Sequence, residues 1–199
     1  MSARSLRVML AVAMALALGA CETKPPMQKL PEISFANKRP IQLNVAELRI
    51  EPAYQPPLKE PNIEHLMPVS PEGATVRWAQ DRLRPMGPAG SGAARVLIND
   101  ARVVRVPLKV EKGITGLFKE EQAERYEGTL DVAVQNLDQR NLPVADVVAR
   151  ATRVKSVPEG ITPNERDRVL HELTEDLITD VDAQMEGLIK TYLARWVMM

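Results

Sequence analysis

Few side chains in this sequence have the chemistry of a catalytic or metal-binding site, and they are far apart. The 199 residues include one cysteine, Cys21, and two histidines, His65 and His171. Neither histidine has the local spacing of a metal site, and no serine or cysteine lies in a nucleophile motif. A Ser-His-acid arrangement that forms only in space stays open, and it would gather His65 or His171 with carboxylates in a polar cleft. We expect no catalytic residues, no metal ligands and no cofactor.

Three carboxylates recur at intervals of four residues near the C-terminus: Glu172, Asp176 and Asp180. On a helix they would share one side, where like charges repel each other weakly. Paired carboxylates can bind Ca²⁺, but the tight loop of a calcium site is missing here. We expect a solvated face that is partly neutralised by arginines of the predicted strands. Candidates for these arginines are Arg95, Arg102 and Arg105.

The N-terminal segment has the layout of a secretion signal. Arg4 and Arg7 provide positive charge, and residues 8–18 form an almost uninterrupted apolar run. Eleven residues are too few to cross a bilayer, which takes about 20. The length and the flanking charges are typical of the hydrophobic part of a signal peptide.

The apolar run ends in the motif Leu18-Gly19-Ala20-Cys21, which resembles the lipobox of bacterial lipoproteins. The resemblance implies that a signal peptidase recognises Leu18, Gly19 and Ala20, that the chain is cut before Cys21, and that Cys21 carries lipid. A plain secretory signal is the alternative, but the only cysteine would then be a free thiol in an oxidising compartment. Two or more acyl chains make attachment effectively permanent.

The residue after the lipobox bears on location. Enterobacterial lipoproteins kept at the inner membrane carry Asp there, whereas this chain has Glu22. By that resemblance we expect a protein anchored in the cell envelope and facing the periplasm, at the outer membrane rather than the inner.

Composition argues against nucleic acid as a partner. The chain has 26 basic and 26 acidic residues, and loss of Arg4 and Arg7 with the signal leaves 24 against 26, a net charge of −2. A chain without a basic field has no electrostatic footprint for DNA or RNA. Aromatic residues are only 4% of the chain, so stacking platforms for bases are not expected either.

We divide the chain into three parts: a signal peptide (1–20), a lipidated proline-rich tether (21–40) and a single α+β domain (41–199). The tether holds Pro25, Pro26, Pro31 and Pro40 and is expected to be an extended spacer. Within the domain, residues 41–50 alternate as a strand with one slip of phase, a sign of a β-bulge. The proline-rich residues 52–71 exclude helix and central strand. They form either a strap that crosses one sheet face or a docking segment for a partner.

Two helices and three further β-regions complete the predicted domain. Ser70-Pro71 begins the first helix, which places Trp78 in the core and ends by Pro85 and Gly87. Residues 94–110 form a β-region with a bulge or bend at Asn99-Asp100. Strands follow over 126–137 and 144–157. Thr162 caps the last helix, whose apolar stripe runs from Leu170 through Leu188 and Tyr192 to Trp196, with Asp182 and Glu186 on the solvated side.

A loop between two predicted strands is the candidate contact site. Ile114, Leu117 and Phe118 are three large apolar residues in a segment with Gly113 and Gly116. If the tip is exposed, they mark a contact with lipid or protein. If it folds back, they plug one end of the core. Replacing Phe118 by Ser distinguishes the two.

The order of elements predicts a two-layer α+β fold, in which a mainly antiparallel four-stranded sheet packs against two helices, the C-terminal one long. With the lipobox, this layout and the Trp78-Ala79 helix after a proline-rich stretch are similar to the ABC-transport auxiliary and lipopolysaccharide-assembly lipoproteins. Residues 116–126 and 164–167 resemble stretches of uncharacterised lipoproteins from α-proteobacteria.

The resemblance implies a non-enzymatic accessory in envelope transport or assembly. Its partners would be the membrane, through the lipid anchor, and a lipid ligand or a subunit of an envelope complex. The alternatives are a structural lipoprotein without ligand, which predicts no sizeable apolar cavity between helices and sheet, or a hydrolase.

Overall fold

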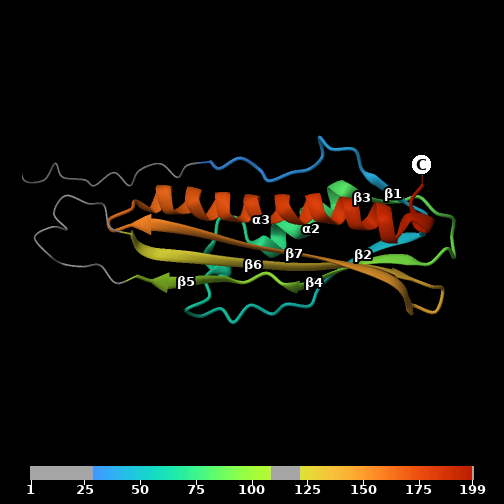
Figure 1. Ribbon diagram of the computed structural model, residues 1–199, viewed down its shortest axis with the longest axis horizontal. Coiled ribbons are helices and arrows are strands. Elements are labelled where there is room, and N and C mark those ends of the chain that lie inside the picture. The colour runs from blue at the N-terminus through green and yellow to red at the C-terminus, as the bar shows by residue number, and fades with distance from the viewer. Residues whose placement is uncertain (1–28, 109–121, 199) are drawn as a thin grey trace, which may run out of the picture.

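The computed structural model describes residues 29–108 and 122–198, and these form two layers (Figure 1). One layer is a mixed, mainly antiparallel sheet. The other holds two helices, α2 (Pro71–Arg82) and α3 (Pro163–Tyr192), on one face of that sheet. The predicted α+β class, with a long C-terminal helix, is therefore confirmed.

The sheet is organised around strand β6. β6 (Gln122–Leu137) and β7 (Pro143–Pro158) form a long antiparallel hairpin. Along its other edge, β6 pairs with β4 (Ala93–Asp100) and then β5 (Val103–Pro107), both antiparallel. β2 (Glu47–Pro52) is parallel to β4 on the far side. β4 and β5 pair with successive parts of the same edge of β6. The sheet of five strands is therefore only four strands wide.

Both helices begin where their sequences predict. The Ser70 hydroxyl accepts a hydrogen bond from the Gly73 N–H (3.1 Å) at the start of α2. At the start of α3, Thr162 and Glu165 form both bonds of a capping box. Proline occupies the first position of each helix, where no N–H partner is needed.

Helix α2 ends earlier than expected, and the predicted first strand is two strands. Leu83–Pro85 leaves the helix as strand β3 and pairs in parallel with β1 (Ile41–Leu43) in a separate two-stranded sheet. The slip of phase in 41–50 is therefore a change of sheet between β1 and β2, not a bulge. The predicted irregularity at Asn99-Asp100 is present, as a register shift between Ile98 and Asp100.

The core lies between the sheet and α3. Leu130, Val132 and Val134 of β6 are fully buried beneath the helix. Gly128 lets the helix approach closely, because a Cβ there would lie 2.7 Å from Leu177 Cδ1. Near its C-terminus the buried stripe passes through Met185, Ile189 and Leu193 rather than Leu188 and Tyr192, and Tyr192 is 67% exposed.

The part of the tether that the structure describes packs on the domain. Ile33 and Phe35 are each 6% exposed and belong to the core. The Asp81 carboxylate of α2 accepts hydrogen bonds from Ser34 Oγ (2.9 Å) and from the Phe35 N–H (2.8 Å). The expected boundary at residue 40 is therefore too late, and the domain includes at least Ile33 to Pro40.

The acidic face of α3 is neutralised, but by other cations than those expected. Arg153 contacts Asp180 (2.7 Å), and Lys155 contacts Asp176 (2.8 Å), with Glu172 at 4.0 Å. Both cations belong to β7, which lies beside α3 (Figure 1). Arg95, Arg102 and Arg105 have other ion-pair partners. No helix within 29–108 and 122–198 has the length and apolar character to cross a membrane.

Candidate functional site

Two groups of candidate residues lie outside the described part of the chain. These are the lipobox motif, Leu18, Gly19, Ala20 and Cys21, and the loop residues Ile114, Leu117 and Phe118. Lipid attachment at Cys21 and exposure of the loop therefore stay predictions. The remaining candidate sites lie within residues 29–108 and 122–198.

The proline-rich strap, residues 52–71, runs along strand β5. The Ile63 N–H donates to the Val103 carbonyl (2.9 Å), and the Arg105 N–H donates to the Pro61 carbonyl (2.9 Å). A short 3-10 turn, η2 (Glu64–Leu66), follows. The strap thus supplies hydrogen bonds to the outer edge of β5 and buries Ile63, which explains how so proline-rich a segment is ordered.

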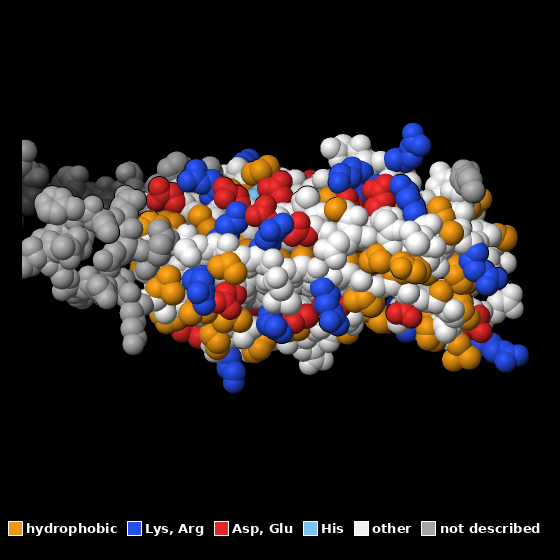
Figure 2. Space-filling model, viewed as in Figure 1, with side chains coloured by type: hydrophobic (Ala, Val, Ile, Leu, Met, Phe, Trp, Pro, Cys, Tyr) orange, Lys and Arg blue, Asp and Glu red, His pale blue; other side chains and the backbone are white. Residues whose placement is uncertain are grey.

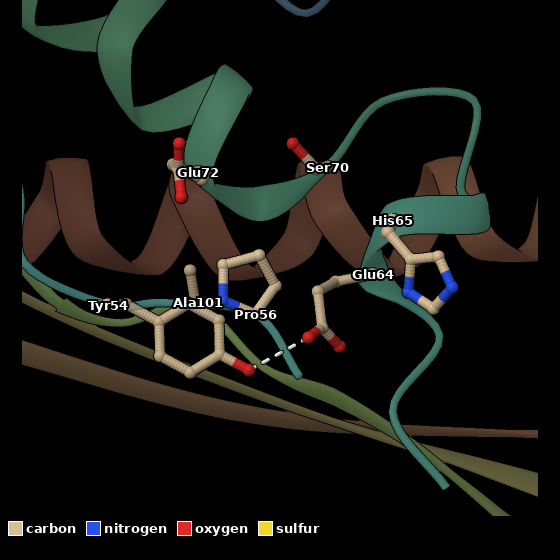
Figure 3. A pocket seen from close by; sticks show the side chains of 7 residues that line it. All are labelled: Tyr54, Pro56, Glu64, His65, Ser70, Glu72 and Ala101. Carbon is tan, nitrogen blue, oxygen red and sulfur yellow. Dashed lines mark hydrogen bonds between the residues drawn. The ribbon is translucent and has the colours of Figure 1, made fainter. Parts of the chain in front are cut away.

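A small pocket opens between the strap and the start of α2 (Figure 3). Its volume is about 120 Å³, similar to engineered cavities of ~150 Å³ that hold one benzene-sized molecule. Seven residues line it: Tyr54, Pro56, Glu64, His65, Ser70, Glu72 and Ala101. In this pocket a histidine, a serine hydroxyl and two carboxylates line a common space.

Glu64 is the buried acid of this pocket, at 4% exposed. Its carboxylate accepts from the Tyr54 hydroxyl (2.8 Å) and from the Val103 N–H (3.1 Å), with Asn62 Nδ2 at 3.4 Å. Burial, and then the hydrogen bond to Glu64, raise the pKa of Tyr54. Because both oxygens of Glu64 already bind groups of the chain, its first role is to fasten the strap to β5.

The histidines are far apart in the fold and differ in environment. His65 lies on the exposed η2 turn, and Figure 3 shows its ring beside Glu64, with a hydrogen bond drawn only between Tyr54 and Glu64. His171 is buried in α3, where Nε2 lies 2.8 Å from the Pro31 carbonyl. His65 thus meets the expectation of a histidine near carboxylates, whereas His171 binds the tether.

A second polar cluster lies between α2 and α3, around Asp182 of α3. This carboxylate is 1% exposed. It accepts from Trp78 Nε1 (2.8 Å), Arg82 Nε (2.7 Å) and Lys38 Nζ (2.7 Å). The cluster joins three segments that are distant in sequence: the tether, α2 and α3.

The charges of this cluster balance within the protein. Arg82, 2% exposed, also contacts Glu186 (2.6 Å) and donates to the Arg39 carbonyl. Burial alone would raise the pKa of the Asp182 carboxyl, but hydrogen bonds from Lys38, Trp78 and Arg82 outweigh it and lower the pKa. A buried carboxylate whose donors all come from its own chain holds segments together and has little capacity left for a ligand.

Asp182 was expected on the solvated side of the helix, and that prediction is wrong, although the sequence holds a signal for its burial. Ile178, Asp182, Met185 and Ile189 are spaced four, three and four residues apart, and all four are buried. An acid on the buried side of an amphipathic helix requires a partner cation, and Arg82 has the matching position on α2.

A third feature is a shallow hollow of about 490 Å³ between α3 and the outer edge of β7. Val148 of β7 lines it together with helix residues, which are Gln184, Gly187, Leu188, Thr191 and Tyr192. Val148 and Tyr192 are exposed, at 41% and 67%. Figure 2 shows hydrophobic side chains in the band between the charged groups over α3 and those over the sheet. This hollow is an open surface feature with exposed apolar groups on both a helix and a strand.

The fold defines a two-layer α+β protein with helices on one face of a mixed sheet. Among solved structures, the chain is similar to a neuraminyllactose-binding hemagglutinin homolog from Helicobacter pylori, with a TM-score of 0.43 and 8% identity over 81% of this chain and 95% of that one. It is also similar to a minor lipoprotein from Acinetobacter baumannii, with a TM-score of 0.38 and 16% identity over 79% and 98% of the two chains. No family model and no curated protein sequence matches the chain.

Proposed function

We propose that this chain is a lipid-anchored protein of the bacterial cell envelope, whose domain faces the periplasm and acts by binding, without catalysis. The observation that carries the proposal is the motif Leu18-Gly19-Ala20-Cys21 at the end of an eleven-residue apolar run, with Cys21 as the only cysteine. The outer membrane is favoured over the inner by Glu22.

The proposed role is that of an accessory to envelope transport or assembly. Its domain would hold a membrane-complex subunit or a lipid close to the bilayer. The hollow beside β7, where Val148 and Tyr192 are exposed, supports a binding role because it offers apolar contacts in a concave surface. A structural lipoprotein without any ligand is the alternative.

Radiolabelled palmitate tests the anchor. The native chain should take up label and fractionate with membranes, whereas Cys21→Ser should do neither. Ala20→Gly keeps a small residue before the cysteine and serves as the matched control, which should still be labelled. If Cys21→Ser fractionates with membranes as fully as the native chain, and the native chain stays unlabelled, the proposal is wrong.

The choice between ligand classes needs a second measurement. Mass spectrometry of lipids that co-purify with the untagged protein, beside a pull-down from membranes, separates a lipid ligand from a protein subunit. Retention of neither would favour the structural alternative.

A hydrolase is the remaining candidate, and one observation favours it. His65, Ser70 and two carboxylates line the strap pocket. However, Ser70 Oγ already accepts the capping hydrogen bond of α2. Activity on small esters that is lost in both His65→Ala and Ser70→Ala would support the hydrolase over the binding role.

A further inference from the structure

Strand β7 forms one edge of the main sheet and pairs only with β6 among the described strands. It is 16 residues long. Long edge strands present free N–H and C=O groups to any other strand, and proteins protect them with proline, bulges or inward charges. Between Ala145 and Thr152, β7 has no proline, and its register with β6 is unbroken.

The hydrogen-bond pattern shows which residues of β7 direct their backbone N–H and C=O groups away from β6, toward the free edge of the sheet. The Thr129 N–H of β6 donates to the Arg102 carbonyl, away from its β7 neighbour Thr152. The pair Thr129–Thr152 is therefore a non-bonded pair of the antiparallel ladder, and Thr152 directs its N–H and C=O to the free edge. The Arg150 carbonyl, which accepts from Gln184 of α3, points outward as well. By alternation, the even-numbered residues from Asp146 to Thr152 face the free edge.

Val147, Ala149 and Ala151 are buried on the side of α3, so the even-numbered side chains lie on the other side of the strand, and Val148 at the edge also borders the hollow beside α3. Val144, Val148 and Val154 are 52%, 41% and 56% exposed, and Leu142 at the hairpin end is 56% exposed. Asp146 and Arg150 flank Val148 on either side. The exposed side of β7 thus carries three valines and, on the two sides of Val148, one charge of each sign.

This pattern is complementary to itself. If two copies of β7 pair antiparallel about a twofold axis at Val148, each Asp146 meets the Arg150 of the other copy. Val144 then meets Thr152, and Val148 meets its own counterpart. Shifting the axis to residue 146 or 150 would instead bring Asp146 against Asp146 or Arg150 against Arg150. Opposite charges and apolar pairs stabilise neighbouring strands, whereas like charges destabilise them.

The backbone pattern fits the same alignment. Asp146, Val148, Arg150 and Thr152 are the paired residues whose N–H and C=O face the free edge, as the bonded pairs of an antiparallel ladder require. On pairing, the Arg150 carbonyl exchanges its hydrogen bond from Gln184 for one from the partner strand. The twofold axis would also bring together the two hollows beside Val148, and the exposed Tyr192 side chains with them.

We propose that the free edge of β7 binds the same edge of a second copy of this chain, in antiparallel register centred on Val148. The result is a continuous sheet through two domains with Asp146–Arg150 pairs on both sides of the axis. The pairing does not depend on the lipid anchor.

Charge reversal tests the register. The full-length protein in mild detergent should have the mass of two chains by light scattering. Asp146→Arg places like charges opposite each other twice, and it should weaken dimerisation about tenfold or more. Asp146→Arg combined with Arg150→Asp exchanges the charges and should restore the dimer. Asp167→Arg makes the same charge change at an exposed position of α3 and should leave dimerisation unchanged.

Cross-linking provides a second test that does not alter the charges. A short bis-maleimide should join two chains of Val148→Cys, since bonded neighbours lie about 5.5 Å apart between Cα atoms. Thr152→Cys should not react, because eight residues at ~3.4 Å place the two copies about 27 Å apart. The native chain, whose only cysteine is Cys21, is the control for cross-linking at that residue. A cross-link in the native chain would show that the Cys21 thiol is free, and therefore that the proposed lipid anchor is absent, without bearing on the pairing of β7.

Three results would overturn the proposal. A native protein that is monomeric at all concentrations would exclude the pairing, and so would a dimer that Asp146→Arg leaves intact. A monomer whose Asp146→Arg form loses a different bound protein would show that the edge binds a foreign strand rather than a second copy. Circular dichroism of each variant must match the native protein, because Arg150 also pairs with Asp131 of β6.

Discussion

Replacing Asp182 by Asn should remove a large share of the stability of the domain. The substitution keeps the size of the side chain but takes away its charge, and Arg82 is then left buried with Glu186 as its only acidic partner. Breaking a buried ion pair by removing one partner costs about 3–5 kcal/mol. Since domains are typically stable by about 5–15 kcal/mol, this is about a fifth of the total or more.

Asp180→Asn is the matched control on the same helix. Asp180 also pairs with an arginine, Arg153, but both side chains are partly exposed, at 29% and 48%. Exposed ion pairs contribute only about 0–1 kcal/mol. The two substitutions make the same chemical change two residues apart, so a difference between them measures the effect of burial.

The pH dependence gives the prediction a second signature. Because the folded-state pKa of Asp182 is lowered, the folded protein binds fewer protons here than the unfolded chain does near the ordinary value of 3.8. The stabilisation is therefore complete above that value and is lost as the pH falls below it through the folded pKa. Native protein and Asp182→Asn should differ most near neutral pH and converge in acid.

Urea unfolding followed by tryptophan fluorescence is the suitable assay, since Trp78 is 1% exposed and donates to Asp182. The free energies of unfolding of the native chain, Asp182→Asn and Asp180→Asn would be compared at neutral and acidic pH. If Asp182→Asn costs no more than Asp180→Asn, or if its cost does not change in acid, the cluster does not hold the tether and helices together as described.

Three further outcomes follow from single residues. Gly92→Ala should lower the free energy of unfolding in urea by several kcal/mol. Gly92 has a φ of +86°, and a Cβ there would lie 2.1 Å from the Leu137 carbonyl oxygen. Thr162→Ala should lower the free energy of unfolding by about 1 kcal/mol through loss of the α3 cap. Burial, and then the hydrogen bond to Glu124, raise the pKa of Tyr126 to about 12. The protonated Tyr126 hydroxyl therefore stabilises the folded protein fully below pH 10, and this stabilisation is lost as the pH rises through 12. Tyr126→Phe should abolish that part of alkaline unfolding, measured by circular dichroism.

Elements specified by local chemistry were predictable from the sequence. Ser70 and Thr162 each precede a proline and accept a hydrogen bond from the N–H three residues later, so both helix starts are set within four residues of chain. Alternation along residues 144–157 is a local signal too, and the strand that it predicts is present as β7, with Ala149 and Ala151 buried and Val148 and Arg150 exposed. Such signals do not depend on how the rest of the chain folds.

Features set by distant parts of the chain were missed. Leu83 looked like the end of a helix, but its backbone pairs with Ile41, more than forty residues away, and this contact converts 83–85 into strand. Asp182 looked solvated because its cations come from residues 38 and 82. The strap pocket could not be predicted either, since it forms only when Glu64 reaches Val103 of β5.

The buried tether changes how far the domain could stand from a membrane. A free spacer from Cys21 to Pro40 would span about 65 Å when fully extended, at about 3.4 Å per residue. Because Ile33 is already part of the core, only eleven residues lie between it and Cys21, and the twelve steps between the two Cα atoms span about 40 Å at most. The twofold axis proposed at Val148 runs perpendicular to the sheet, so the helix layers of both copies lie on the same side. Both tethers pack on that layer, and two lipid anchors could therefore enter one bilayer.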